Sequence, residues 1–283
     1  MKLSRANRTF QERSSHLIRS TGLRWMLPSI VVFVFFSAAV RTPGQRISAH
    51  PVPANKSSTK PPAIVIGFVG GFVAHDNPVH SEVQLAARLR KEYPAGVDVE
   101  TFESYRGEKA QKEIQKLLDT NHDGTITVEE KQNARIVIYG HSWGGSQAVY
   151  LARALEKEGI PVLLTLQVDS VSRPGADDTT IPANVAQAAN FYQSHGLIRG
   201  HHDIRAANPA RTRIVGNFQF DYESSPLKCS EYPWYDRIFV KAHTQIECDP
   251  MVWNQVESLI RSNLPPVTPS GTKPNWTKPS ATK

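Results

Sequence analysis

The fold of this chain is decided by one stretch, residues 136–145, which reads IVIYGHSWGG. Its first four residues are β-formers and predict a buried strand, and residues 147–155 carry apolar side chains at helical spacing. Between these segments, Gly140 and Gly144 flank Ser142 in the pattern Gly-x-Ser-x-Gly, which is typical of a sharp turn between a strand and a helix. We therefore expect the Ser142 hydroxyl to lie at the carboxyl edge of a sheet.

Strand-like and helix-like segments alternate through the rest of residues 63–262. Strands are predicted at 63–68, 97–102, 136–139, 161–168, 213–220 and 237–240, and helices at 81–93, 109–118, 146–158, 183–193 and 250–262. Helices of this length between strands indicate βαβ units, which build a mostly parallel sheet with helices on both faces. The functional site of such a sheet lies beyond the carboxyl ends of its strands, where Ser142 falls.

In the serine turn and in the order of its elements, the chain resembles the α/β-hydrolase superfamily of serine esterases, lipases and related acyl hydrolases. The resemblance covers about residues 63–262. It implies an α/β-hydrolase fold and an enzyme in which Ser142 attacks an ester, thioester or amide carbonyl, without an organic cofactor. Aromatic side chains near the serine favour a lipase-like or esterase-like enzyme acting on a small-molecule or lipid carboxylic ester.

The resemblance also implies a triad acid that follows the serine in the chain and lies just past a strand end. Asp169 directly follows the strand predicted at 161–168 and is the favoured acid. Asp221 follows the next predicted strand and is its main competitor, whereas Asp177 and Asp178 lie in a polar loop.

The triad base is expected after the last strand. His243 follows the strand predicted at 237–240 and precedes the final helix, where the superfamily carries its histidine. The alternatives are His201 and His202, which lie in a loop before the preceding strand. His141, inside the serine turn, is expected to pack there rather than to act as the base.

Hydrolysis of this kind requires two backbone N–H groups that stabilise the oxyanion of the tetrahedral intermediate. The resemblance assigns one to Trp143, directly after the serine, and the other to the loop at 67–72, with Gly71 and Phe72 as the candidates. This loop lacks the His-Gly pair that superfamily members usually carry. A non-catalytic, calcium-stabilised surface binding module on a hydrolase scaffold is therefore the alternative function.

A second motif lies at residues 119–130 and matches a twelve-residue calcium loop position by position. Its oxygen ligands would be Asp119, Asn121, Asp123, Thr125 and Glu130, with a glycine at position 6. The loop resembles EF-hand and dockerin-type calcium loops. Only three residues separate it from the strand before Ser142, so the second EF-hand helix is absent or vestigial, and we expect a structural rather than a sensing Ca²⁺ site.

The formal net charge of +7 is unevenly distributed. Residues 1–60 carry ten Lys and Arg and one Glu, and residues 261–283 carry four Lys and Arg and no acid, which leaves residues 61–260 with a net charge of −6. A mildly acidic body argues against nucleic-acid binding.

The N-terminal residues predict export. Residues 1–24 are polar and basic, and residues 25–40 are uncharged and mostly apolar, so residues 1–40 are either a cleaved signal peptide or an uncleaved membrane anchor. Both alternatives place the body in the periplasm, outside the cell or at the membrane, away from the cytoplasm. The predicted organisation continues with a flexible linker at 41–62, one monomeric hydrolase domain at 63–264 and a disordered tail at 265–283.

The expected export of the protein decides whether its two cysteines are predicted to be bonded or free. Cys229 and Cys248 enclose 18 residues, and a disulfide is favoured over two free buried thiols in an oxidising environment. Closing a loop of this size stabilises a fold by about 3 kcal/mol.

Overall fold

The computed structural model describes residues 61–266, which lie in the second of two compact units, Pro53–Lys283. The predictions for residues 1–60 and for the tail from 267 onward lie outside the described residues. Between 61 and 266, no helix combines the length and the apolar character needed to cross a membrane.

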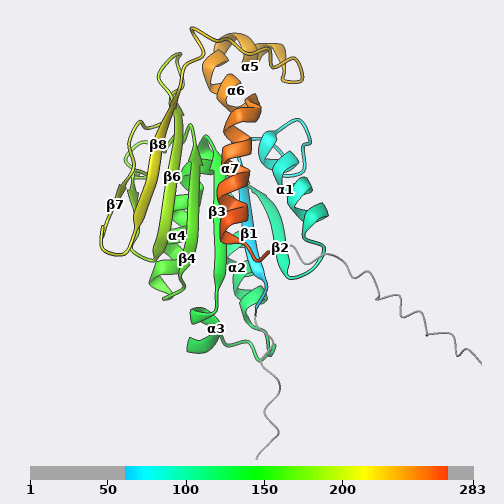
Figure 1. Cartoon of the computed structure of the whole chain (residues 1–283), viewed down its shortest axis with the longest axis vertical. Coiled ribbons are helices and arrows are strands. Elements are labelled where there is room, and N and C mark those ends of the chain that lie inside the picture. Colours follow the sequence, from blue (N-terminus) through cyan, green and yellow to red (C-terminus); the bar gives the residue numbers. More distant parts are fainter. Residues whose placement is uncertain (1–60, 267–283) are drawn as a thin grey trace, which may run out of the picture. The chain divides into compact units, whose positions relative to one another are not determined.

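The centre of the fold is a sheet of six strands in the order β2-β1-β3-β4-β6-β8, and every neighbouring pair is parallel (Figure 1). The strands are β1 (Ala63–Val69), β2 (Val97–Glu103), β3 (Arg135–His141), β4 (Val162–Val168), β6 (Val185–Gln193) and β8 (Arg213–Phe220). The short strands β5 (Thr180–Ile181) and β7 (Arg205–Ala206) pair separately. Parallel pairing brings the carboxyl ends of β3 and β4 to one edge, where Ser142 and Asp169 follow.

Helices cover both faces of this sheet, which explains why its central strands are buried along almost their whole length. The helices are α1 (Ser81–Glu92), α2 (Gly107–Leu118), α3 (Val128–Gln132), α4 (Trp143–Lys157), α5 (Trp234–Phe239), α6 (Lys241–Cys248) and α7 (Pro250–Asn263). Leu85 of α1 and Trp253 of α7 pack in one buried cluster, and Ile114 of α2 and Val149 of α4 pack in the other. All seven residues of β1 are buried, as expected for a strand covered on both faces.

The helix predicted at 183–193 is wrong, because these residues form β6. The alanines and glutamines of this segment favour a helix weakly, but β6 fills the position between β4 and β8 and buries Phe191 completely. Pairing with two strands outweighs the local propensity of the sequence.

The strand predicted at 237–240 is also wrong, because the chain there belongs mainly to the helix α5. Trp234 and Ile238 lie one helical turn apart on this helix, and none of its six residues is buried. A β-branched, apolar run therefore occupies an exposed helix instead of an internal strand.

Candidate active site

The serine turn joins β3 to the 15-residue helix α4 and holds Ser142 in a strained backbone conformation. Ser142 has φ 56° and ψ −124°, which non-glycine residues rarely adopt. Crossing backbone segments force this geometry: a Cβ atom on Gly144 would lie 2.2 Å from the carbonyl oxygen of Phe68, and one on Gly140 would lie 2.4 Å from that of Gly144. The strain presents the serine, which is 8% exposed, at the head of α4.

Asp169 and His243 are joined by a short hydrogen bond, with 2.6 Å between His243 Nδ1 and Asp169 Oδ2. The fully buried Asp169 carboxylate also accepts hydrogen bonds from the Gln193 side chain at 2.8 Å and from the Gly200 backbone N–H at 2.7 Å. His243 lies in the first turn of α6, not after a strand as expected. Because Nδ1 is engaged by the acid, Nε2 is the nitrogen of His243 that remains for a serine hydroxyl.

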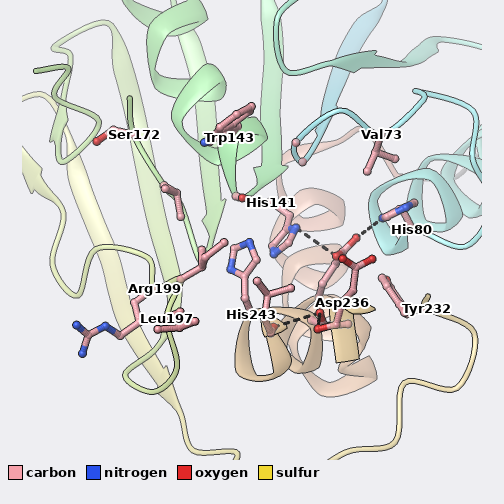
Figure 2. A pocket seen from close by; sticks show the side chains of 18 of the residues that line it. Val73, His80, His141, Trp143, Ser172, Leu197, Arg199, Tyr232, Asp236 and His243 are labelled. Atoms are coloured by element: carbon pink, nitrogen blue, oxygen red, sulfur yellow. Dashed lines mark hydrogen bonds and ion pairs between the residues drawn. The ribbon is translucent and has the colours of Figure 1, made fainter. Parts of the chain in front are cut away.

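Ser142 and His243 line one cavity of about 620 Å³. Figure 2 shows His243 and Trp143 among the side chains around it. Apolar side chains form much of its wall, and these are Val73, Trp143, Val171, Leu197, Ile198 and Val240. An apolar cavity beside a strained serine and a histidine–carboxylate pair can bind and attack an uncharged acyl group.

The side chains of the alternative acids and bases make other contacts. Asp221 is exposed and accepts a hydrogen bond from the Ser224 hydroxyl at 2.6 Å. Asp178 is buried but lies 3.0 Å from His201, and Asp177 is exposed. The exposed His202 stacks on Tyr192 with 4.8 Å between the ring centroids. Among the predicted acids, Asp169 is the one that contacts His243.

The predicted oxyanion donors surround the serine turn. Trp143 is the first residue of α4, and backbone N–H groups in a first helical turn have no partner within the helix. Gly71 lines the cavity with φ 47°, whereas Phe72 is 88% exposed and lies edge-on to the Trp143 ring at 5.3 Å. Of these two residues, Gly71 is the one that lines the cavity.

No protein-family model and no curated protein sequence matches this chain. Among solved structures, the chain is similar to the RedJ thioesterase from the prodiginine pathway of Streptomyces coelicolor (10% identity, TM-score 0.37, 78% of this chain and 100% of that chain). It is also similar to a Pyrobaculum calidifontis esterase (12% identity, TM-score 0.37, 71% of this chain and 78% of that chain). A third similar structure is carboxyl esterase 2 from Tuber melanosporum (12% identity, TM-score 0.39, 72% of this chain and 78% of that chain).

The chain has the α/β-hydrolase fold. This assignment depends on the six parallel strands, the helices on both faces of the sheet and the serine turn after the third of the six strands along the chain. The low identities and TM-scores of the similar structures add nothing about activity.

A further group of buried polar side chains lies beside the serine turn, and the sequence analysis did not identify it. We call it the His-Glu cluster; its members are His80, Glu82, His141 and Glu247. His80 Nδ1 lies 2.5 Å and His141 Nδ1 lies 3.5 Å from the Glu247 carboxylate, and Figure 2 shows both rings directed toward it. Only the short pattern His-x-Glu at 80–82 signals the cluster locally, because the other two residues are distant in the sequence.

Burial dominates the electrostatics of the His-Glu cluster. Burial, together with the nearby Glu247 carboxylate, raises the pKa of Glu82 well above its ordinary value. Burial likewise raises the pKa of Glu247 to about 7, against a smaller lowering by His243. Burial and the neighbouring rings of His243 and His80 lower the pKa of His141. Of the two carboxyl groups, that of Glu247 lines the cavity, and its burial favours the protonated form.

The predicted calcium loop follows α2 and makes the sharp turn that its glycine requires, with φ 83° at Gly124. The Asp119 carboxylate accepts hydrogen bonds from the backbone N–H groups of Asp123 and Gly124. Glu130, however, caps the five-residue helix α3, and both of its oxygens accept hydrogen bonds from Thr120 and Thr127. These hydrogen bonds lower the pKa of Glu130 to about 2.

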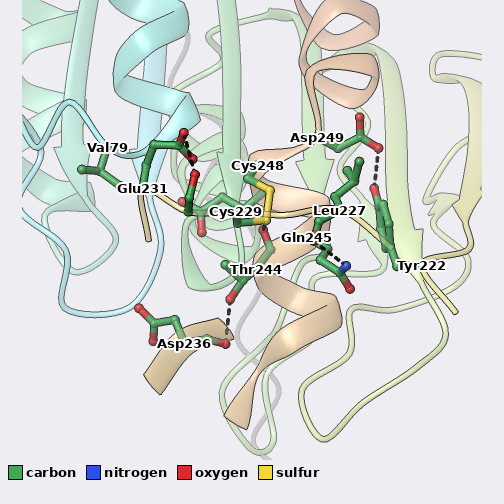
Figure 3. The surroundings of a disulfide bond; sticks show 12 residues. Val79, Tyr222, Leu227, Cys229, Glu231, Asp236, Thr244, Gln245, Cys248 and Asp249 are labelled. Atoms are coloured by element: carbon green, nitrogen blue, oxygen red, sulfur yellow. Dashed lines mark hydrogen bonds between the residues drawn. A yellow bond between two sulfur atoms is a disulfide. The ribbon is translucent and has the colours of Figure 1, made fainter. Parts of the chain in front are cut away.

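Cys229 and Cys248 form a disulfide with 5.9 Å between their Cα atoms (Figure 3). Cys248 is the last residue of α6, the helix that carries His243 and Glu247. The bridge therefore attaches the loop at Cys229 to the helix that holds the histidine of the candidate site.

Proposed function

We propose that this protein is a serine hydrolase that cleaves a carboxylic ester. The observation that supports it best is the strained Ser142, which opens onto the same cavity as the hydrogen-bonded His243–Asp169 pair. A structural serine has no need of this conformation, because strain of this kind costs about 1–3 kcal/mol and persists where function requires it.

In the proposed reaction, Ser142 Oγ attacks the ester carbonyl carbon while its proton passes to His243 Nε2. Asp169 orients the ring and stabilises the imidazolium. The oxyanion accepts hydrogen bonds from the N–H of Trp143 and from a donor in the loop at Gly71. His243 then gives its proton to the departing alcohol oxygen, which leaves the acyl group on Ser142. Water attacks this acyl-enzyme and passes its proton to His243, and the carboxylic acid leaves as Ser142 regains the proton.

An uncharged, apolar acyl group is the substrate we propose, from a small molecule or a lipid. The cavity wall is rich in aliphatic and aromatic side chains. Helix α5 also exposes a group of large apolar side chains, and its Asp236 borders the cavity; this group comprises Trp234, Tyr235, Ile238 and Phe239. Exposed apolar patches of this kind often mark binding surfaces for other molecules.

We further propose that the domain is exported and that its 119–130 loop holds a structural Ca²⁺ ion. The basic, then apolar, N-terminal sequence and the disulfide support export. The oxygens of Asp119, Asn121 and Asp123 suit Ca²⁺, which would stabilise the loop and take no part in the chemistry. Glu130 is engaged as a helix cap, so it joins the ligand set only if that cap opens.

Labelling by a fluorophosphonate probe tests the hydrolase proposal. We expect the full-length wild type to be labelled, and Ser142→Ala and His243→Ala to lose labelling while keeping the wild-type circular dichroism spectrum. His202→Ala, which removes an exposed histidine, is the matched control and should label normally. A folded wild type that resists labelling would contradict the proposal and favour the non-catalytic binding module.

A further inference from the structure

The His-Glu cluster brings together donor atoms from three distant segments of the chain. His80 caps α1, Glu82 lies in its first turn, His141 ends β3 and Glu247 lies near the end of α6. Each side chain belongs to a residue that is 8% exposed or less. One donor atom each from His80, Glu82 and Glu247 can be chosen within 4.8 Å of the others.

Several atoms of this cluster have no hydrogen-bond partner. Within the described part of the chain, both carboxylate oxygens of Glu82 and both ring nitrogens of His141 are buried and lack a hydrogen-bond partner. An unpaired buried polar group costs about 1–3 kcal/mol, and more when it is charged. Four such atoms at one place favour a bound partner that would satisfy them.

The charge of the cluster is equally unbalanced. Among the described residues, the ion pairs of Glu82 and Glu247 are made with histidines alone. Burying two carboxylates this close together is strongly unfavourable unless a proton or a cation compensates their charge. A divalent cation would supply the missing charge and accept the lone pairs of the unpartnered atoms at once.

We propose that the His-Glu cluster binds one divalent transition-metal ion of the Zn²⁺ type. Imidazole nitrogens together with carboxylates are ligands typical of Zn²⁺, whereas Ca²⁺ and Mg²⁺ prefer oxygens alone. Zn²⁺ binds such ligands at about 2.0–2.2 Å, so two ligands of one ion lie about 3–4 Å apart. His141 Nδ1 lies 3.5 Å from one Glu247 oxygen and 3.9 Å from a Glu82 oxygen, which matches this spacing. His80 Nδ1 lies 2.5 Å from the other Glu247 oxygen, so this hydrogen bond would open when both side chains bind the ion.

The ion would connect the two halves of the candidate active site. Glu247 lies one helical turn after His243 on α6, so their side chains share a face of that helix. His141 directly precedes Ser142, and its ring lies 4.4 Å from that of His243. A metal bound to both His141 and Glu247 thus holds the base in register with the serine, and the four ligands are positioning residues.

Metal content of the full-length chain tests the proposal without any measurement of hydrolysis. The chain is purified with a tag that lacks histidines, depleted of metal with a chelator, and titrated with Zn²⁺ and with Co²⁺. We expect one tightly bound ion per chain and, for Co²⁺, the visible d–d absorption bands of a four-coordinate site. A folded wild type without stoichiometric binding and without these bands overturns the proposal and leaves a proton shared between the two carboxyl groups.

Conservative variants locate the ion. Glu82→Gln and Glu247→Gln keep the side-chain volume and should each weaken Zn²⁺ binding at least about 10-fold, the loss that even outer-shell partners of metal ligands produce. Glu103→Gln is the matched control, because Glu103 pairs with His75 at 2.9 Å outside the cluster, and it should bind Zn²⁺ as the wild type does. Equal affinity of all three variants for Zn²⁺ would contradict the assignment.

Different results test the metal site and the hydrolase activity, so one proposal can be refuted while the other stands. Ser142→Ala should keep stoichiometric Zn²⁺ while it loses fluorophosphonate labelling. Metal removal from the wild type should slow labelling and lower Tm, since α6 loses its attachment to β3. Labelling that is unaffected by complete metal removal would overturn the positioning role.

Discussion

At the scale of single residues, the orientation of His243 depends on how firmly Asp169 is held. Asp169 has φ 41°, and its carboxylate accepts hydrogen bonds from a side-chain amide and a backbone N–H in addition to that of the histidine. These donors fix both oxygens in a fully buried place. Gln193 is therefore a supporting residue that fixes the acid, and the acid in turn fixes the ring.

Asp169→Asn should lower kcat for ester hydrolysis by about 10⁴-fold with little change in fold, because an amide in place of the carboxylate favours the wrong histidine tautomer. Asp221→Asn is the control, since Asp221 is exposed and contacts Ser224 and His195 instead of His243. Steady-state kinetics with a chromogenic ester distinguish the two variants. Loss of activity in Asp221→Asn alone would reverse the assignment of the acid.

Single residues differ in how far the sequence could predict them. Ser142 and Asp169 follow apolar runs, so their place at a sheet edge is predictable from the strands before them. His243 is predicted in the correct part of the chain, although it lies in α6 and not after a strand. The His-Glu cluster could not be predicted, because His141 and Glu247 meet only through the packing of α6 beside β3.

At the scale of elements, the serine turn depends on how closely α4 approaches the strands. Gly144 of α4 packs against the backbone at the end of β1, and Gly140 of β3 packs against Gly144 itself. Backbone atoms cannot move aside as a flexible side chain can. The absence of a Cβ at these positions is therefore what lets the turn form.

Gly144→Ala should destabilise the fold by about 1–3 kcal/mol, the usual cost of overpacking, because its new methyl group meets the backbone of Phe68. Gly107→Ala is the matched control, since its methyl group meets only the end of the Gln147 side chain. Urea denaturation measures both variants. A loss of stability in Gly107→Ala as large as in Gly144→Ala would refute the explanation from backbone contact.

The elements that the sequence predicts wrongly are those whose structure depends on tertiary position. Strands such as β1 and β4 are dense in β-branched and leucine residues, so their local pattern agrees with their burial. The segment that forms β6 has helix-favouring alanines and glutamines, and pairing on both sides determines its structure. Helix α5 combines apolar residues with solvent exposure, which no strand pattern anticipates.

The loop at 119–130 gives a prediction of its own. Adding Ca²⁺ to about 100 times its Kd should stabilise the full-length chain by about 2.7 kcal/mol, since the folded state alone binds the ion. The double variant Asp119→Asn and Asp123→Asn should lose this effect, and Asp203→Asn, an exposed acid outside the loop, should keep it. Thermal melts with Ca²⁺ or a chelator measure the shift. A Tm that Ca²⁺ leaves unchanged would show that Glu130 serves only as the cap of α3.

At the scale of the whole molecule, the disulfide and the proposed metal ion hold the same helix from different sides. The Cys229–Cys248 bridge attaches the C-terminal end of α6 to the loop after β8, and Glu247 faces the cluster beside β3. Helix α6 carries the histidine of the candidate triad, and the disulfide attaches its C-terminal end. An exported protein can rely on a disulfide of this kind, because its environment keeps the bond oxidised.

Replacing Cys229 and Cys248 together by serine should lower the free energy of unfolding by about 3 kcal/mol, because the unfolded chain regains the freedom of a closed loop. Labelling of Ser142 should also fall at a lower temperature in the double variant than in the wild type, because the bridge no longer attaches the helix that carries His243. Urea denaturation of wild type and double variant, with and without reductant, checks the first expectation, and fluorophosphonate labelling over a temperature series checks the second. Reductant should lower the free energy of unfolding of the wild type and leave that of the double variant unchanged. If reductant destabilised both proteins equally, the disulfide would not be the source of the wild type's extra stability.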